Sequence, residues 1–193
     1  MGLDMYLNRM PRYKGATARD VSRVESFMDW IKAKAEGSEY AQCTFKEWCG
    51  ADKVPSTDYL NFYSDYYHVY YSDWDTEKKH PWTTIKEQVG YWRKANQIHN
   101  WFVENIQEGV DDCDYHREVT QEDLEELRDI CHEVLCNLDL AELRLPTAPG
   151  FFFGSYEYDE WYVEDLRNTI DIINKVLETT NFDTQMLYYC SSW

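Results

Sequence analysis

The chain has 193 residues, and its 36 Asp and Glu against 19 Lys and Arg give a formal charge of −17 at pH 7. Aromatic residues make up 17% of it. Because disordered chains are poor in aromatics, this composition excludes disorder and favours one globular domain over residues 1–193. A protein this acidic is repelled by nucleic-acid phosphate and by anionic lipid. We therefore expect a basic protein as partner, with no direct contact to nucleic acid or to a membrane.

The first 50 residues predict one strand and two capped helices. Residues 2–8 are mostly apolar, which indicates an opening strand. Residues 17–20 form a capping box, and apolar residues then recur at helical spacing as far as Gly37. A second capping box at residues 44–47 predicts a short helix that ends at Gly50. The start of the chain lacks the basic and apolar parts of a signal peptide, which favours a reduced cytosolic protein.

Residues 51–82 are crowded with Tyr and Trp. Spacings of three and four suit a helix, but the Tyr and Val content suits strands. We interpret this stretch as an irregular aromatic insertion with some strand. Residues 58–77 contain no Lys or Arg, so a groove for single-stranded nucleic acid is disfavoured and a Tyr-rich protein-contact surface fits better.

The second half predicts alternating strands and helices. Residues 83–89 indicate a strand, and from Tyr91 the apolar spacing becomes helical as far as Gly109. A short strand at residues 115–119 precedes a third capping box at residues 120–123 and a helix with an apolar face. A long helix is expected at about 158–178 and a closing strand at 185–190. The order predicts an α+β fold with about four main helices and a small sheet of three or four strands.

The negative charge is concentrated in one third of the chain. Residues 1–103 carry 14 acids and 14 bases, whereas residues 104–165 carry 19 acids and 3 bases. In the predicted helix after residue 120, acids occupy the face opposite the apolar one. These candidate partner-binding residues are Glu122, Glu125, Glu126, Asp129 and Glu133. A purely solubilising role for the same charge is the open alternative.

A polar cluster at residues 92–100 is the best candidate for ligand binding. Side chains of this kind on one helix are able to grip a phosphate, a carboxylate or a base edge. The candidates are Arg93, Asn96, Gln97 and His99, with Ser155 from the loop of residues 151–155. A solvated polar face is the alternative. Because the predicted helix is aromatic on several sides, we expect some of these polar groups to be part-buried and partnered.

Residues 111–116 hold carboxylates, a thiol and an imidazole, with Asp112, Asp114 and His116 as candidate metal ligands. Arg117 occupies the position where a calcium loop needs Gly, and the paired Cys and His spacings of zinc sites are missing. An exposed acidic turn is therefore the better interpretation. The acids at residues 157–160 suit a helix N-terminus, where the macrodipole favours negative charge.

The usual catalytic signatures are absent from the sequence. It contains no G-x-x-x-x-G-K-[ST], G-x-G-x-x-G, H-E-x-x-H or G-x-S-x-G pattern. We therefore predict no catalytic residue and no cofactor, and we lean against an enzyme. A metal-dependent enzyme at residues 112–116 would need a distant ligand that the sequence does not identify.

Several blocks of the sequence resemble small proteins encoded by bacteriophages and prophages. The blocks are MGLDMYL at the start, YWRKANQIH, LPT with GFFFGS, YDEWY and the terminal SSW. They cover both ends and the middle of the chain, whereas residues 9–82 lie outside the resemblance. That family carries no established activity, so no site residue is transferred. The resemblance implies a phage accessory protein that acts in the cytoplasm of the bacterial host, and it favours a counter-defence role.

Two functions from different classes follow. The first is a non-enzymatic inhibitor whose acidic surface mimics nucleic acid and competes for the basic groove of a host nuclease or CRISPR effector. The second is a nucleotide-binding or small-molecule-binding protein that uses the helix around Arg93 and His99 and the loop ending at Ser155. The identity of the partner and the oligomeric state stay open.

Overall fold

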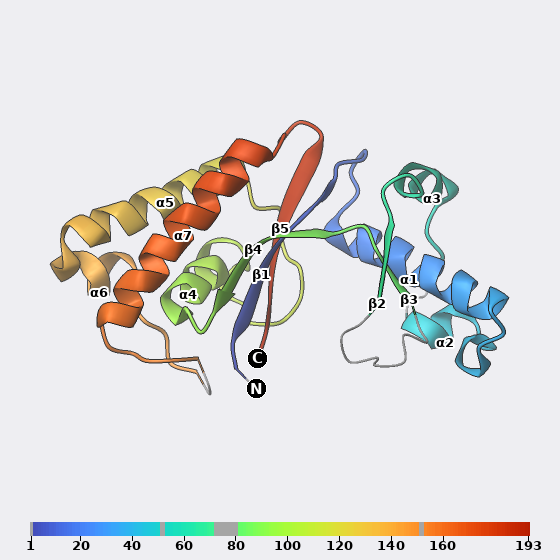
Figure 1. Ribbon diagram of the computed structural model, residues 1–193, viewed down its shortest axis with the longest axis horizontal. Helices are drawn as coiled ribbons and strands as arrows, with labels where there is room; N and C mark the ends of the chain where they lie inside the picture. The colour runs from blue at the N-terminus through green and yellow to red at the C-terminus, as the bar shows by residue number, and fades with distance from the viewer. Residues whose placement is uncertain (1, 51–52, 72–80, 151–152) are drawn as a thin grey trace. The chain divides into compact units, whose positions relative to one another are not determined.

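The computed structural model describes residues 2–50, 53–71, 81–150 and 153–193 (Figure 1). The chain divides into two compact units, of which unit 1 comprises Met1–Arg9 with Gln88–Trp193 and unit 2 comprises Met10–Glu87. Unit 2 is thus an insertion in the chain of unit 1, and the predicted aromatic insertion at residues 51–82 lies within it. The prediction of one domain over the whole chain stays a prediction, and each unit is described by itself.

Unit 1 contains a three-stranded antiparallel sheet with the order β4-β1-β5. The central strand β1 spans Asp4–Pro11, and it is flanked by β4 (Glu87–Arg93) and β5 (Gln185–Ser192). Side chains of β1 alternate between the faces of the sheet, so Met5 and Leu7 are buried on the same face. The predicted opening and closing strands are therefore confirmed.

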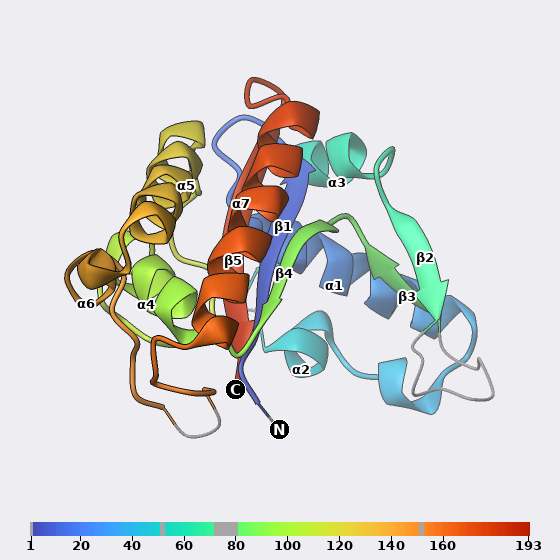
Figure 2. The same ribbon diagram turned by 60° about the vertical axis from the view of Figure 1, so that its left-hand side comes forward.

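Helices cover this face of the sheet (Figures 1 and 2). They are α4 (Asn96–Asn105), α5 (Gln121–Cys136), the single turn α6 (Ala141–Arg144) and α7 (Glu160–Thr179), with a 3₁₀ turn, η2, at Leu138–Leu140. Helix α5 begins at the predicted capping box, in which Thr120 and Asp123 cap each other's backbone amides. Helices α5 and α7 pack along each other through their apolar faces.

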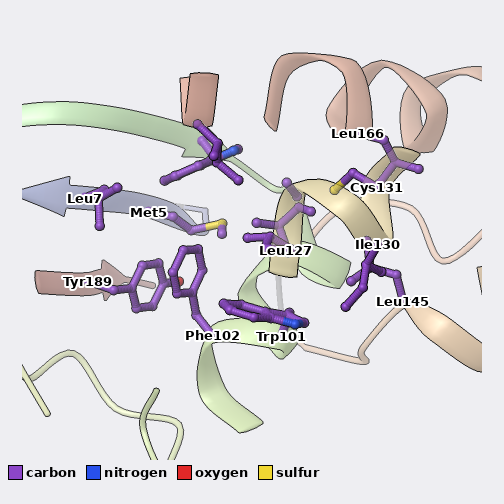
Figure 3. Close-up of a cluster of buried hydrophobic side chains, with 14 of the residues drawn as sticks. Met5, Leu7, Trp101, Phe102, Leu127, Ile130, Cys131, Leu145, Leu166 and Tyr189 are labelled. Atoms are coloured by element: carbon purple, nitrogen blue, oxygen red, sulfur yellow. The ribbon is translucent and has the colours of Figure 1, made fainter. Parts of the chain in front are cut away.

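The core of unit 1 lies between these helices and the sheet (Figure 3). The rings of Phe102 from α4 and Tyr189 from β5 stack in parallel with centroids 4.0 Å apart. Leu127 and Cys131 of α5 and Leu166 of α7 belong to the same buried cluster, in which Cys131 lies beside Leu166. Full burial of side chains of this size stabilises the fold by about 1.5–3 kcal/mol each, so packing against helices is the main support of this small sheet.

Unit 2 consists of short helices and a two-stranded sheet. Helix α1 spans Ala18–Ala35, and it is followed by the 3₁₀ turn η1 (Glu39–Ala41), α2 (Phe45–Cys49) and α3 (Thr57–Tyr63). Strands β2 (His68–Tyr71) and β3 (Pro81–Thr84) pair antiparallel. Both predicted capping boxes, at residues 17–20 and 44–47, are confirmed. The buried carboxylate of Glu25 accepts a hydrogen bond from the amide of Ile85 and pairs with Lys86.

Three sequence predictions about secondary structure were wrong. The described chain contains seven α-helices rather than about four main ones, and of the three short helices only α2 was predicted, whereas α3 and α6 were not. Residues 57–63 form a helix inside the stretch that was expected to be irregular, whereas Trp74 lies outside the described residues. Residues 115–119 form no strand, and Val119 makes only an isolated bridge to Leu187.

The predicted helix from Tyr91 was also placed wrongly, because Tyr91 belongs to strand β4. Lys94 then adopts a left-handed backbone conformation with φ 61°, and its amide donates to the carbonyl of Leu3 beside β1. The pairing of β4 with β1 thus keeps Tyr91 in a strand, although the spacing of the apolar residues is helical. A Cβ on Gly90 would lie 3.0–3.1 Å from Ile172, Trp92 and Leu7, so Gly allows α7 to pack closely on β4.

Candidate functional site

A hollow of about 450 Å³ lies in unit 1 beside the first turns of α7. The end of β4, helix α4, residues 154–157 and the start of α7 all contribute to its lining. Its polar and aromatic lining residues include Arg93, Gln97, Ser155, Glu157, Trp161 and Asp165. The volume lies within the range of small-molecule sites, although the lining is more polar than is usual for them.

The turn between β4 and α4 shapes one wall of the hollow. A Cβ on Gly154 would lie 2.7 Å from the carbonyl oxygen of Lys94, and Gly154 has φ +107°. Only Gly satisfies both the close approach and this backbone conformation. The loop after residue 153 therefore lies directly against the β4–α4 turn.

Asn96 ties this loop to the first turn of α4. Its side chain is 1% exposed. Its amide nitrogen donates to the carbonyl oxygens of Phe153 (3.3 Å) and Ser155 (2.8 Å), and its amide oxygen accepts from the backbone amide of Ala148 (3.0 Å). Asn96 was predicted to contact a ligand, but its contacts make it a positioning residue for the wall of the hollow.

Gln97 and Asp165 meet inside the hollow. Gln97 is 2% exposed, and its Nε2 donates to Asp165 Oδ2 at 3.1 Å. Both side chains line the hollow. Residues 68 positions apart in the sequence thus form one polar pair between α4 and α7.

Burial raises the pKa of Asp165 to about 6. The hydrogen bond from Gln97 lowers this pKa, whereas the nearby carboxylates of Asp159 and Glu164 raise it further. The carboxyl group therefore changes charge close to neutral pH, and it is mostly ionised at pH 7. A carboxyl group with a raised pKa in a hollow is a frequent property of functional sites.

Trp161 lines both this hollow and a second one. It lies in the first turn of α7 and is 76% exposed. The second hollow, of about 690 Å³, is lined by Trp161, Tyr158 and Leu138 together with the carboxylates of Glu160 and Glu164. An exposed Trp among carboxylates and hollows has the composition of a protein-binding hot spot with a polar rim.

The predicted acidic face of α5 is exposed to solvent. Glu122, Glu126, Asp129 and Glu133 are exposed, and Glu125 is half-buried. Two ion pairs neutralise part of this face, from Arg128 to Asp129 (3.3 Å) and from Arg144 to Glu133 (2.8 Å). Glu125 accepts a hydrogen bond from Gln121 at 2.9 Å. Exposed pairs of this kind contribute little to stability, so these carboxylates are available for a partner.

His99 lies in the core rather than in the hollow. It is 1% exposed, its Nε2 donates to Asp111 Oδ1 at 3.0 Å, and the Tyr189 hydroxyl donates to its Nδ1 at 2.7 Å. This assignment follows because an ionised carboxylate only accepts. Burial lowers the pKa of His99 more than Asp111 raises it. The imidazole is therefore neutral at pH 7 and acts as a structural link between α4 and β5.

The candidate metal ligands form a hydrogen-bonded turn. His116 Nε2 and the amide of Asp114 both donate to Asp112 Oδ1, at 2.9 Å each. Asp114 Oδ1 in turn accepts from the amide of Tyr115 at 2.8 Å. Within the described ranges, no group of three or more His, Cys, Asp or Glu side chains has the arrangement of a metal site. The metal site stays a prediction without geometric support.

The structure thus brings three of the predicted ligand residues, Arg93, Gln97 and Ser155, to one hollow. Sequence reasoning missed Trp161 and Asp165. A signal for both was present in the predicted helix at 158–178, because Trp161 lies off the apolar stripe and Asp165 lies next to it. A large aromatic residue outside the apolar stripe of a helix indicates an exposed aromatic side chain. An acidic residue beside the stripe indicates a part-buried carboxyl group.

Comparisons with known proteins do not place the chain in a family. Neither a protein-family model, nor a curated protein, nor a solved structure matches it. In the part of the chain that the structure describes, no helix combines the length and the apolar character needed to cross a bilayer.

Proposed function

We propose that this protein is a non-enzymatic inhibitor that binds a basic protein of the bacterial host through unit 1. The observation that carries this proposal is the exposed Trp161, which lines two hollows and lies among the carboxylates of Asp159, Glu160 and Glu164. Trp is enriched at the centres of protein interfaces, and complementary charge around it increases the association rate and the selectivity for a partner.

The charge of unit 1 supports a partner that normally binds nucleic acid. Unit 1 contains 23 acids and 8 bases, and its net charge of −15 accounts for nearly all of the −17 of the chain. Carboxylates spaced along α5 would stand in for phosphates in a basic groove. A host nuclease or a CRISPR effector has such a groove, and the resemblance to phage proteins fits a counter-defence role in the host cytoplasm.

The first test captures proteins from a bacterial host extract on the immobilised protein. The quadruple variant E122Q/E125Q/E126Q/D129N is expected to weaken binding on the order of tenfold, because each exposed charge contributes a few tenths to one kcal/mol. The matched control, E36Q/E39Q/D58N/D65N, removes the same charge from exposed positions of unit 2 and is expected to retain binding.

The captured protein must also meet two further conditions. Its binding is expected to weaken between about 50 mM and about 300 mM salt, because screening shortens the range of the attraction. Nucleic acid is expected to compete with the inhibitor for it. Binding that is insensitive to salt, to nucleic acid and to the quadruple variant would contradict the proposal.

A second candidate function is supported by the hollow beside α7. Its volume of about 450 Å³ and its polar lining, with Arg93, Gln97 and Ser155, suit a small-molecule ligand. In this function the protein sequesters a small molecule of the host. A screen of metabolite mixtures by thermal shift tests it, and a rise in the melting temperature that the hollow variant S155W abolishes would support it.

A further inference from the structure

We infer that the hollow beside α7 is a site for an organic cation, namely an alkylguanidinium or alkylammonium group. This inference deepens the second candidate function and rests on the hollow being a ligand site. Two acceptor atoms carry it, Asp165 Oδ1 and Gln97 Oε1, which belong to a hydrogen-bonded pair of side chains that both line the hollow.

The side chain of Gln97 has an acceptor that bonds to none of the described residues. Its side chain is 98% buried and lines the hollow, and its Nε2 donates to Asp165 Oδ2 at 3.1 Å. Within the described part of the chain, Gln97 Oε1 makes no hydrogen bond. Because the carboxylate of Asp165 only accepts, it holds the Gln97 amide in the orientation that leaves Oε1 as the remaining acceptor. A part-buried acceptor of this kind favours a ligand that donates.

Asp165 supplies the charge. Its Oδ2 is occupied by Gln97, and no hydrogen bond to its Oδ1 occurs among the residues that the structure describes. The neighbouring charges that act on it are the carboxylates of Asp159 and Glu164, which makes the surroundings negative. A cation that binds here offsets the cost of a part-buried carboxylate.

The rim of the hollow fits the rest of such a ligand. The exposed indole of Trp161 provides a face for a cation–π contact, and Glu157 adds a second carboxylate. A guanidinium carries its donors in a planar fork that matches two neighbouring acceptors. Arg93 and Lys94 also line the hollow, and their positive charges suit a carboxylate on the same ligand.

The negative surroundings make the hollow a poorer site for a nucleotide. Three carboxylates (Glu157, Asp159 and Asp165) line it against two cations. The Arg93 guanidinium also lies 3.9 Å from Asp4, so part of its charge is already balanced. Asp159 is partly balanced by the amides of Trp161 and Tyr162, whereas Asp165 meets no cation among its neighbouring charges in the described chain. A phosphate would be repelled by this carboxylate, which is why the cation is the favoured ligand class.

The test is an NMR titration of the ¹⁵N-labelled full chain with propylguanidinium chloride. The neutral isostere propylurea is the matched ligand control. Propylguanidinium is expected to shift the Trp161 indole and Gln97 side-chain amide signals saturably, and propylurea is not. The variant Asp165→Asn is expected to weaken the binding at least about tenfold. Asp171→Asn, an exposed substitution on the same helix, is expected to leave it unchanged.

The pH dependence gives a further readout. Asp165 must be ionised to hold a cation, so the affinity of the wild-type protein is expected to rise between pH 5 and pH 7. The charged groups that act on Asp165 are the carboxylates of Asp159, at the N-cap of α7, and of Glu164 in α7. Arg93 and Lys94 from the β4–α4 turn and Glu157 from the loop line the same hollow. Asp165→Asn is expected to remove this rise, and Asp171→Asn is expected to retain it.

Two further ligands distinguish a free small molecule from the side chain of a protein partner as the source of the cation. L-arginine carries a free carboxylate for Arg93 and Lys94, whereas capped acetyl-Gly-Arg-Gly-amide imitates the side chain of a protein partner. Tighter binding of arginine supports a free small molecule, and equal or tighter binding of the peptide supports a partner side chain. Saturable binding of AMP without binding of propylguanidinium would overturn the cation class but not ligand binding. Binding of none of these probes would overturn both.

Discussion

Replacing Asn96 with Ala is expected to lower the free energy of unfolding by about 2–4 kcal/mol, the largest effect of any single polar substitution around the hollow. The wild-type side chain is 1% exposed and makes three hydrogen bonds to residues 148–155. Truncation leaves the amide of Ala148 and the carbonyl of Ser155 without their partner in a part-buried setting. Leaving such groups unpaired costs more than the net value of the bonds themselves.

Urea denaturation followed by circular dichroism measures this effect. Asn100→Ala, on the same helix at a half-buried position, is the matched control and is expected to change the free energy by less than about 0.5 kcal/mol. An Asn96→Ala protein as stable as the wild type would show that the loop is held by other contacts. It would also restore Asn96 as a candidate for direct ligand contact.

Replacing Asp165 with Asn is expected to stabilise the protein by about 1–2 kcal/mol at pH 8. Burial raises the pKa of Asp165 from 3.8 to about 6, so the folded chain holds this proton more tightly than the unfolded chain does. The stability associated with the neutral carboxyl group is complete below the unfolded pKa and is lost as the pH rises through about 6. Asn removes this loss, while its amide oxygen still accepts from Gln97.

The size of the effect therefore depends on pH. The gain from Asp165→Asn is expected to be near zero at pH 4 and to reach its full size above pH 7. Urea denaturation of both proteins across this range measures it, with the exposed substitution Asp171→Asn as control. A gain that is the same at pH 4 and pH 8 would mean that the ionisation of Asp165 is not its cause.

A residue that reduces stability at neutral pH has a functional interpretation. Proteins retain such residues where activity depends on a group whose burial destabilises the fold. Asp165 matches this description, because its carboxylate lies in a hollow and its neighbours Asp159 and Glu164 add to the unfavourable charge. The stability measurement and the cation titration thus examine the same group by independent means.

Local sequence signals predicted the starts of the three helices that have capping boxes. The boxes at Thr17, Thr44 and Thr120 all cap helices in the way that was expected, because each involves hydrogen bonds within four residues. The acidic face of α5 was predicted for a similar reason, since the periodicity of an amphipathic helix assigns each residue to a face.

Non-local pairing explains where these signals failed. Tyr91 has helical spacing to Ala95 and Ile98, yet it lies in β4, because hydrogen bonds to β1 and a left-handed turn at Lys94 end the strand just before α4. Likewise, Asn96, Gln97 and His99 were predicted to act together on one ligand. Nearly the whole circumference of α4 is buried, so Asn96, Gln97 and His99 each contact a different element.

The sequence by itself determined the class of fold, the helix caps, and the position of the charge in residues 104–165, because these properties depend on neighbours within a few turns of the chain. Only the tertiary structure decided that Gln97 and Asp165 share a hollow and that Trp161 stands exposed at its rim. The reason is physical. The packing of the β4–α4 turn against α7 brings together residues 68 positions apart, and no local periodicity encodes that distance.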